Sequence, residues 1–139
     1  MESNLHIGKS VVVEMIASVE NTSEERCGFL FGNATNSRII TSIMSTPNIS
    51  TEDKRRHFAI DPLKYLHAEG YASHNNLELL GIFHSHPNER AVPSETDRKA
   101  AQPFLSYVIL SVLQAKFSAI RSWRLNHDRL FEEEVIIQY

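Results

Sequence analysis

The chain has 139 residues, 42% of them hydrophobic, which predicts one domain over residues 1–139 with a core that needs no disulfide. Its 14 Lys and Arg against 17 Asp and Glu leave a net charge of −3, so we expect no broad basic surface for nucleic acid. The single cysteine excludes an internal disulfide and a multi-thiolate zinc site, and it suits a reducing compartment. We see no signal pattern and no apolar run near the roughly 20 residues of a membrane span, so we expect a cytoplasmic protein without a membrane partner.

The first half of the chain alternates helical and strand patterns. Apolar residues from about Lys9 to Glu20 recur at helical spacing and predict an amphipathic helix. Two strands are predicted over residues 27–32 and 37–45, and the turn rich in Asn and Gly between them favours an antiparallel pair. A second helix begins after Asp61, which takes the N-cap position with Pro62 as the first helical residue.

The second half supplies most of the predicted sheet. An apolar strand over residues 77–83 runs directly into His84. A short helix over residues 94–102 begins with Ser94 and Asp97 at capping-box spacing, and a proline ends it. Three further strands are predicted over residues 106–113, 117–126 and 132–139. The sum is an α+β domain with a mixed, mostly antiparallel sheet flanked by helices.

The residues that carry chemistry are concentrated in one stretch, GIFHSHPNERAVPSETD over residues 81–97. Alternate residues of a strand face the same side, so His84 and His86 can converge on one ion. Asp97 lies in the first turn of the next helix and can return a carboxylate to the same point. Two nitrogen ligands and one oxygen ligand favour zinc over magnesium or calcium, and three protein ligands leave a fourth position for water.

Each part of this stretch also has an ordinary structural explanation. A pair of histidines on a strand is common without metal, and a carboxylate at a helix start complements the helix dipole. Ser94 can act as an N-cap alone. We expect Ser85, on the opposite face, to be a packed and hydrogen-bonded hydroxyl. Outside the stretch, we expect Cys27 to be a small buried core residue and Trp123 to anchor the core. The combination is therefore more informative than any single residue.

The combination resembles the JAMM motif of the MPN+ (Mov34/PAD-1/JAB) metallopeptidases. That motif reads Glu, then His-(Ser/Thr)-His-Pro, six residues, Ser, two residues and Asp, and the spacing from His84 to Asp97 matches at every step. The upstream Glu of the family commonly precedes Cys-Gly on the first core strand, and in SEERCGFLFG the aligned residue is Glu25 rather than Glu24. HFAIDPLKYL, LLGIFHSHP and IRSWRL also look like the family's frame, so the resemblance covers nearly the whole chain.

The resemblance implies an MPN/JAB (cytidine-deaminase-like) fold and a compact, prokaryote-like zinc metallopeptidase. It implies that His84, His86 and Asp97 hold one Zn²⁺ with a bound catalytic water. Glu25 would carry the water's proton to the departing amine, and Ser94 would hydrogen-bond the developing oxyanion. The implied substrate is the isopeptide or peptide bond after the Gly-Gly-type tail of a ubiquitin-like protein, in deconjugation or precursor processing.

Three other interpretations stay open at this point. A peptidase that trims the tail of a sulfur-carrier protein would use identical chemistry. A closed structural site would use Glu25 as a fourth ligand and would only stabilise the fold. A non-catalytic MPN scaffold module would have lost its metal ligands, whereas every ligand position of the motif is filled here.

Overall fold

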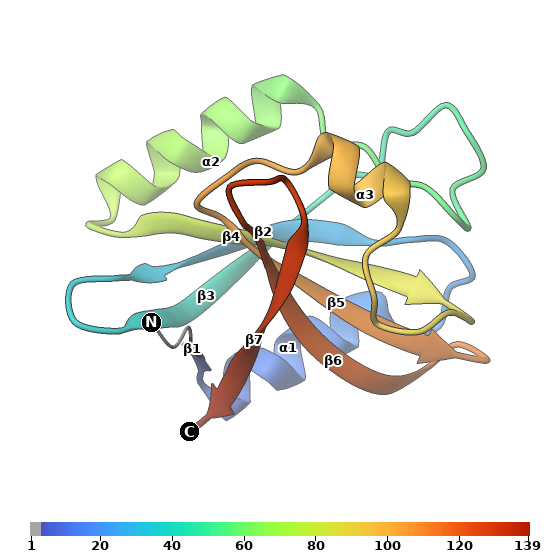
Figure 1. Ribbon diagram of the computed structural model, residues 1–139, viewed down its shortest axis with the longest axis horizontal. Coiled ribbons are helices and arrows are strands. Elements are labelled where there is room, and N and C mark those ends of the chain that lie inside the picture. The colour runs from blue at the N-terminus through green and yellow to red at the C-terminus, as the bar shows by residue number, and fades with distance from the viewer. Residues whose placement is uncertain (1–3) are drawn as a thin grey trace.

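All the helices and strands predicted from the sequence are present in the computed structural model, which describes residues 4–139 (Figure 1). The helices are α1 (Lys9–Val19), α2 (Pro62–His74) and α3 (Glu95–Ala100). The strands are β1 (Asn4–Ile7), β2 (Cys27–Asn33), β3 (Arg38–Thr46), β4 (Glu78–Pro87), β5 (Ser106–Leu113), β6 (Lys116–Leu125) and β7 (Phe131–Gln138). Within residues 4–139, no helix combines the length and the apolar character of a membrane span.

The sheet is mixed, as predicted, but it closes into a barrel, which the sequence did not predict. The strand order is β1-β3-β2-β4-β5-β6-β7. β1 makes the closure, because it pairs in parallel with β3 on one side and with β7 on the other. β4 and β5 are also parallel, and the remaining neighbours are antiparallel. With only four residues, β1 is too short to show a strand periodicity, and its partner β7 lies at the far end of the chain.

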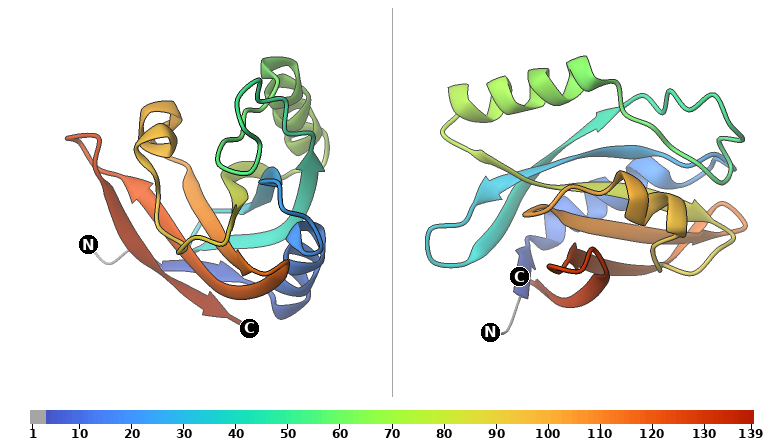
Figure 2. Two further views of the ribbon diagram at one scale, coloured as in Figure 1. Left: turned by 90° about the vertical axis from the view of Figure 1, so that its right-hand side faces the viewer. Right: turned by 45° about the horizontal axis from the view of Figure 1, so that its top comes forward.

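β2 and β4 are buried along most of their length and separate two hydrophobic cores. Leu30 and Phe83 belong to the core packed against α1, whereas Phe29 and Ile82 belong to the core under α2. α1 lies on one side of the barrel, and α2 and α3 lie on the other (Figures 1 and 2). Side chains alternate along a strand, so His84 faces the same side as Ile82. The motif histidines therefore face α2 and α3.

The predicted helix starts are confirmed by their hydrogen bonds. The Asp61 carboxylate accepts from the Leu63 N–H at 2.9 Å, with Pro62 in the first helical turn. At α3, the Ser94 hydroxyl accepts from the Asp97 N–H, and the Asp97 carboxylate accepts from the Ser94 N–H. Such caps typically contribute about 0.5–2 kcal/mol each. The cap at α3 also fixes the direction in which the Asp97 side chain points.

Trp123 does not anchor the core, contrary to the prediction. It is only half-buried on β6, and its indole Nε1–H donates to the Ala91 carbonyl at 3.1 Å. The Arg121 guanidinium lies 4.8 Å from the centre of the same ring. An indole offers both an apolar face and a polar donor, so it suits the boundary between a sheet and a loop. Here it ties β6 to the loop between β4 and α3.

Truncating a core side chain of β1 is expected to destabilise the whole barrel. Leu5 is fully buried in the α1 core, so Leu5→Ala should lower the free energy of unfolding by about 2–5 kcal/mol. Val135, which is 56% exposed on the neighbouring strand, provides the control, and Val135→Ala should change it by less than about 1 kcal/mol. Urea denaturation measures both. Equal, small effects would mean that β1 does not dock as described.

Candidate metal centre

Three side-chain atoms from β4 and α3 that could bind a metal converge on one buried point. Nε2 of His84 lies 3.1 Å from Nε2 of His86, and Oδ2 of Asp97 lies 3.2 Å and 3.1 Å from these two nitrogens. The three side chains are 1%, 7% and 9% exposed. Ligands placed about 2.0–2.1 Å from a tetrahedral zinc ion are about 3.3 Å apart. The triangle therefore has the size of one face of such a site, and it contains the three residues predicted as metal ligands.

The hydrogen bonds and pKa shifts of the two histidines suit a positive charge at the centre of this triangle. Nδ1 of His86 donates to the Arg90 carbonyl at 3.0 Å, since a carbonyl oxygen can only accept. Burial lowers the pKa of His84 and so favours the neutral form of its imidazole. Burial also opposes the charge on His86, but contact with Asp97 outweighs it and raises the pKa of His86. A divalent cation at this point would offset the negative charge of Asp97 and accept the lone pairs of the two imidazoles.

The surroundings of Asp97 favour the ionised form of its carboxylate, which is the form that can bind a cation. Burial alone would raise its pKa, but the two histidines and the hydrogen bond from the Ser94 N–H outweigh burial and hold the pKa well below the ordinary value. That N–H donates to Oδ2, the same oxygen that contacts the histidines, at 2.9 Å. Asp97 is therefore both a helix cap and a member of the triangle.

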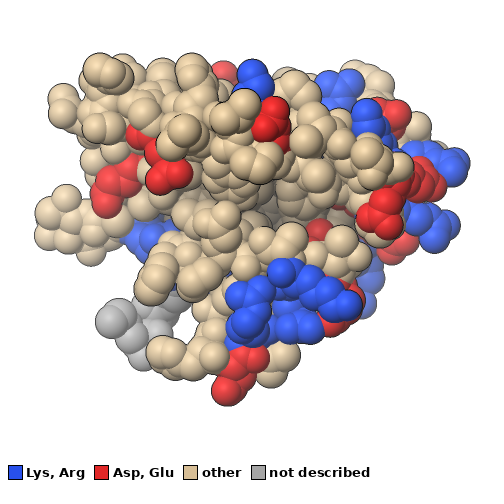
Figure 3. Space-filling model, turned by 90° about the horizontal axis from the view of Figure 1, so that it is seen from above, with Lys and Arg blue, Asp and Glu red and all other residues tan. Residues whose placement is uncertain are grey.

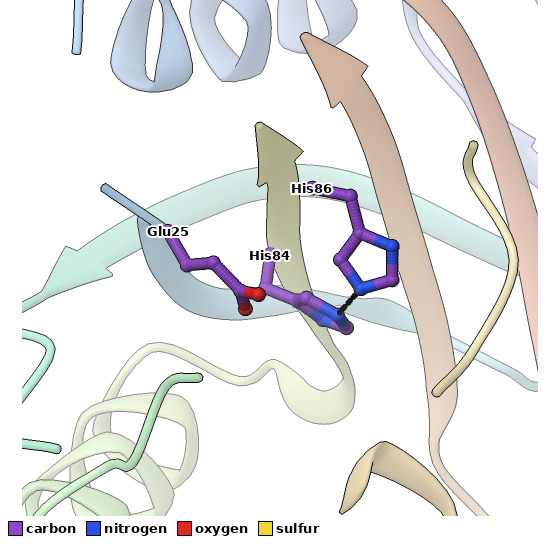
Figure 4. A group of neighbouring side chains, drawn as sticks. All are labelled: Glu25, His84 and His86. Atoms are coloured by element: carbon purple, nitrogen blue, oxygen red, sulfur yellow. Dashed lines mark hydrogen bonds between the residues drawn. The ribbon is translucent and has the colours of Figure 1, made fainter. Parts of the chain in front are cut away.

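Glu25 reaches the same region from the segment that leads into β2. Cys27 pairs with His84, and two further antiparallel steps bring Glu25 beside His86. The Glu25 N–H donates to the Lys54 carbonyl at 2.7 Å, which ties this segment to the loop between β3 and α2. Figure 4 shows the carboxylate directed toward both imidazoles. One of its oxygens and a ring nitrogen of each histidine all lie within 4.8 Å of one another.

The Glu25 carboxyl is buried without a compensating bond. The residue is 3% exposed, and within the described part of the chain its Oε1 has no hydrogen-bond partner. Burial raises its pKa to about 8; His86 opposes this change, and the negative charges of Asp97 and Glu89 add to it. The metal-free chain therefore keeps Glu25 protonated at neutral pH. A nearby divalent cation would lower this pKa and leave the carboxylate able to accept a proton.

Two residues that support the centre were not predicted from the sequence. The Phe58 ring stacks on His84, with centroids 4.3 Å apart and planes 25° apart, and shields it from water. The Asn48 side chain donates to the carbonyls of Glu25 and His57, both at 3.0 Å, and so joins the two segments. The only sequence signal for either was the family-like frame around Phe58. Asn48 lies in a polar loop with no motif to mark it.

The short helix α3 depends on polar contacts at both ends, because none of its residues is buried. At its start, the Ser94 Oγ accepts from the Asp97 N–H at 3.0 Å, which leaves the hydroxyl proton available to donate. At its end, the Arg129 guanidinium donates to the carbonyls of Arg98 and Ala101 at 2.9 Å and 3.1 Å. The β6–β7 turn therefore holds the helix that presents Asp97.

Ser85 and Cys27 take the structural roles predicted for them. The Ser85 hydroxyl is fully buried and accepts from the Arg26 N–H at 2.9 Å. Cys27 is 1% exposed, and burial raises the pKa of its thiol to about 12. At neutral pH this thiol is protonated and therefore a poor nucleophile or metal ligand.

Two cavities meet at the centre and differ in character. The first, which we call the aromatic cavity, has a volume of about 240 Å³ and reaches His84 and Asp97. Its other lining residues include Phe58, Ile60, Tyr65, Ala100 and Tyr107. The second, the arginine cavity, has a volume of about 390 Å³ and reaches His86, Glu25 and Ser94. Its other lining residues are Arg55, Arg56, Glu89, Arg90, Val92 and Pro93.

The fold and the centre can be compared with known proteins. A family model described as prokaryotic homologs of the JAB domain matches residues 8–126. The chain belongs to this JAB family. Two solved structures of similar fold cover 97% of the chain and 92% of their own chains. They are solution structures of proteins from Desulfitobacterium hafniense (TM-score 0.84, 31% identity) and Salinibacter ruber (TM-score 0.75, 28% identity).

Two curated relatives have names that describe an activity. The chain is 26% identical over 137 residues to the desampylase of Pyrococcus furiosus, a match that covers 98% of this chain and 92% of that protein. It is 36% identical over 72 residues to a probable TtuB-protein conjugate cleaving protease of Thermus thermophilus. That match covers 52% of this chain and 48% of the relative. The relatives of this JAB-family chain therefore include a named protease.

The buried Glu25 carboxyl should make the metal-free protein less stable at high pH. A carboxyl with a raised pKa stabilises the fold fully below its unfolded value of 4.5, and this contribution is lost as the pH rises through about 8. A pKa difference of one between the folded and unfolded chain corresponds to about 1.4 kcal/mol of stability. With chelator present, Glu25→Gln should therefore be more stable than the wild type by a few kcal/mol at pH 9 and nearly equal to it at pH 4.5. Urea denaturation at the two pH values measures the difference, and a constant difference would contradict the burial argument.

Proposed function

We propose that this JAB-family chain is a zinc-dependent isopeptidase or peptidase that cleaves after the Gly-Gly-type tail of a ubiquitin-like protein. The observation that carries the proposal is the triangle of His84, His86 and Asp97, with edges of 3.1–3.2 Å, next to the buried carboxyl of Glu25. The names of the relatives support the substrate class, since one is named as a probable TtuB-protein conjugate cleaving protease.

The triangle residues would hold the zinc ion, and they fit it in size, burial and donor type. Bound zinc supplies an activated water molecule near neutral pH and polarises the scissile carbonyl. His86 is kept in the ligand tautomer by its bond to the Arg90 carbonyl, and Phe58 keeps water away from His84. The metal ligands are thus oriented before any substrate arrives.

Glu25 would move the proton of the reaction. It takes one proton from the attacking water as the water oxygen bonds to the acyl carbon. It then donates this proton to the amide nitrogen as the carbon–nitrogen bond breaks. The products are the carboxylic acid of the tail and a free amine, which accounts for both hydrogens of the water. Asp97 contacts the two histidine nitrogens directly and Glu25 does not, which supports Asp97 as the ligand and Glu25 as the proton carrier.

Ser94 would stabilise the negative charge that develops on the carbonyl oxygen. Its Oγ is fixed by the N–H of Asp97, and its remaining proton can donate to that oxygen. It lines the arginine cavity together with Glu25 and His86, so it borders the place where the carbonyl must lie.

The other interpretations differ in how well they fit. Tail trimming of a sulfur carrier uses the same residues and belongs to the same proposal. A scaffold module has no use for an assembled set of metal ligands, so the triangle argues against it. A closed structural site would use Glu25 as a fourth ligand, whereas Glu25 does not contact the histidine nitrogens as Asp97 does. We place the reaction in the cytoplasm, where the buried thiol of Cys27 would stay reduced.

Replacing Glu25 should separate metal binding from catalysis. Glu25→Gln should retain zinc and lower kcat by about 10²–10⁴-fold, because the amide cannot carry the proton. Glu24→Gln is the matched control, since Glu24 is an exposed neighbour, and it should leave kcat unchanged. His84→Ala should lose both zinc and activity. The measurements are zinc content and hydrolysis of a Gly-Gly-tailed peptide with and without chelator.

Two results would contradict these assignments. Full activity of Glu25→Gln would show that another group carries the proton. Absence of bound metal in wild-type protein after zinc supplementation would favour the scaffold interpretation.

Replacing Ser94 should separate its kinetic role from its structural one. Ser94→Ala should lower stability by about 0.5–2 kcal/mol through loss of the cap and lower kcat by about 10²-fold or more. Ser94→Thr keeps both the cap and the hydroxyl, and it should restore most of the activity. Steady-state kinetics and denaturation measure the two effects. A loss of stability in Ser94→Ala with unchanged kcat would reduce Ser94 to a cap.

A further inference from the structure

The two cavities at the centre divide the substrate into an acyl side and an amine side. Hydrolysis breaks one bond, so the tail and the leaving amine must lie on opposite sides of the attacked carbon. Glu25 must reach the departing nitrogen to protonate it, and Glu25 lines the arginine cavity. The aromatic cavity reaches His84 and Asp97 without Glu25. On the proposed function, the leaving group would lie in the arginine cavity and the tail residues before the scissile carbonyl would lie in the aromatic one.

The arginine cavity has two guanidinium groups that are free to bind a ligand. Arg55 is already engaged, because it donates to both carboxylate oxygens of Asp53 at 3.0 Å. Within residues 4–139, no hydrogen bond or ion pair engages the exposed guanidinium groups of Arg56 and Arg90. Glu89 is the one exposed carboxylate in the lining, so the available charge of this cavity is positive. Seen from above, Lys and Arg side chains lie beside Asp and Glu side chains at the right of this face, and a further group of Lys and Arg lies at its lower centre (Figure 3).

The two free arginines lie in loops that are hydrogen-bonded to residues of the candidate metal centre. Arg90 lies in the loop between β4 and α3, and its backbone carbonyl accepts from His86. Arg56 lies in the loop between β3 and α2, whose Lys54 carbonyl accepts from the N–H of Glu25. Both arginines therefore belong to segments that are bonded to residues of the centre. The aromatic cavity has no Lys or Arg among its lining residues.

We propose that Arg56 and Arg90 select a leaving group that carries a carboxylate close to the scissile amine. This inference rests on the function proposed above and defines which substrates that centre prefers. Guanidinium groups bind carboxylates through paired, charge-assisted hydrogen bonds. The carboxylate has two possible sources: the α-carboxylate of a single amino acid released from the tail, or an acidic side chain beside a conjugated lysine.

Two matched pairs of peptide substrates test the proposal and separate the sources. The first pair ends in Gly-Gly-Ala, with a free carboxylate in one member and an amide in the other. The second pair carries a Gly-Gly tail on a lysine side chain, with Glu next to that lysine in one member and Gln in the other. We expect kcat/KM to be about tenfold higher for the carboxylate member of at least one pair. The preference should shrink as salt is raised, because exposed charges are screened.

Variants identify the groups responsible. Arg56→Gln and Arg90→Gln should each reduce the preference, measured as the ratio of kcat/KM between the two members of a pair, and the double variant should bring that ratio to about one. Arg26→Gln is the control, since Arg26 is exposed near Glu25 but lines a different depression, and it should keep the full preference. This control removes the same charge from the same region, so it accounts for general electrostatic effects.

The outcomes distinguish this inference from the proposed function. A preference in the first pair alone identifies a released amino acid, and a preference in the second pair alone identifies an acidic conjugate; either supports the inference. Equal cleavage within both pairs, or a preference that survives in the double variant, would overturn it and leave the hydrolase intact. Failure of the zinc-loaded protein to cleave any of the four peptides would instead count against the proposed function.

Discussion

Three electron-rich atoms lie within 3.2 Å of one another at a point almost without solvent, and the rest of the centre follows from that constraint. A buried group of acceptor atoms is unfavourable unless a proton or a cation lies among its members. The ring of His86 cannot turn away, because Nδ1 is bonded to the Arg90 carbonyl, and Asp97 cannot swing out, because the Ser94 N–H holds it. The fold therefore holds these three candidate ligands together through hydrogen bonds of its own.

The helix that presents Asp97 is held by strands remote in the sequence. α3 has six residues and contributes none of them to a hydrophobic core, so it cannot be stable alone. Arg129, in the turn between β6 and β7, caps its last carbonyls, and Trp123 of β6 binds the loop before it. β7 is in turn held by β1 in the closed barrel. Closure of the barrel thus fixes the geometry of a site that lies on its opposite face.

The sequence predicted the parts of this molecule that are local and missed those that join distant segments. Helix starts, strand alternation and the His84-to-Asp97 spacing are short-range patterns, and the structure has them as expected. β1 and the barrel closure depend on pairing between the two ends of the chain, which no periodicity records. Glu25 was aligned only through a family resemblance, and its approach to His86 depends on the register of β2 and β4. Trp123 was misjudged because hydrophobicity alone ignores its N–H donor.

The two cavities differ in charge, and this difference affects how each would act on a cation at the centre. An aromatic wall on the side of His84 removes water and keeps that imidazole neutral, which is the form that binds a metal. Arginines on that side would repel a bound cation across a medium of low dielectric constant. On the other side, Arg56 and Arg90 are exposed, so hydration would screen them from an ion at the centre, while Glu89 offsets part of their charge. Of the two cavities at this candidate metal centre, the one with free guanidinium groups is therefore the one that also contains Glu25.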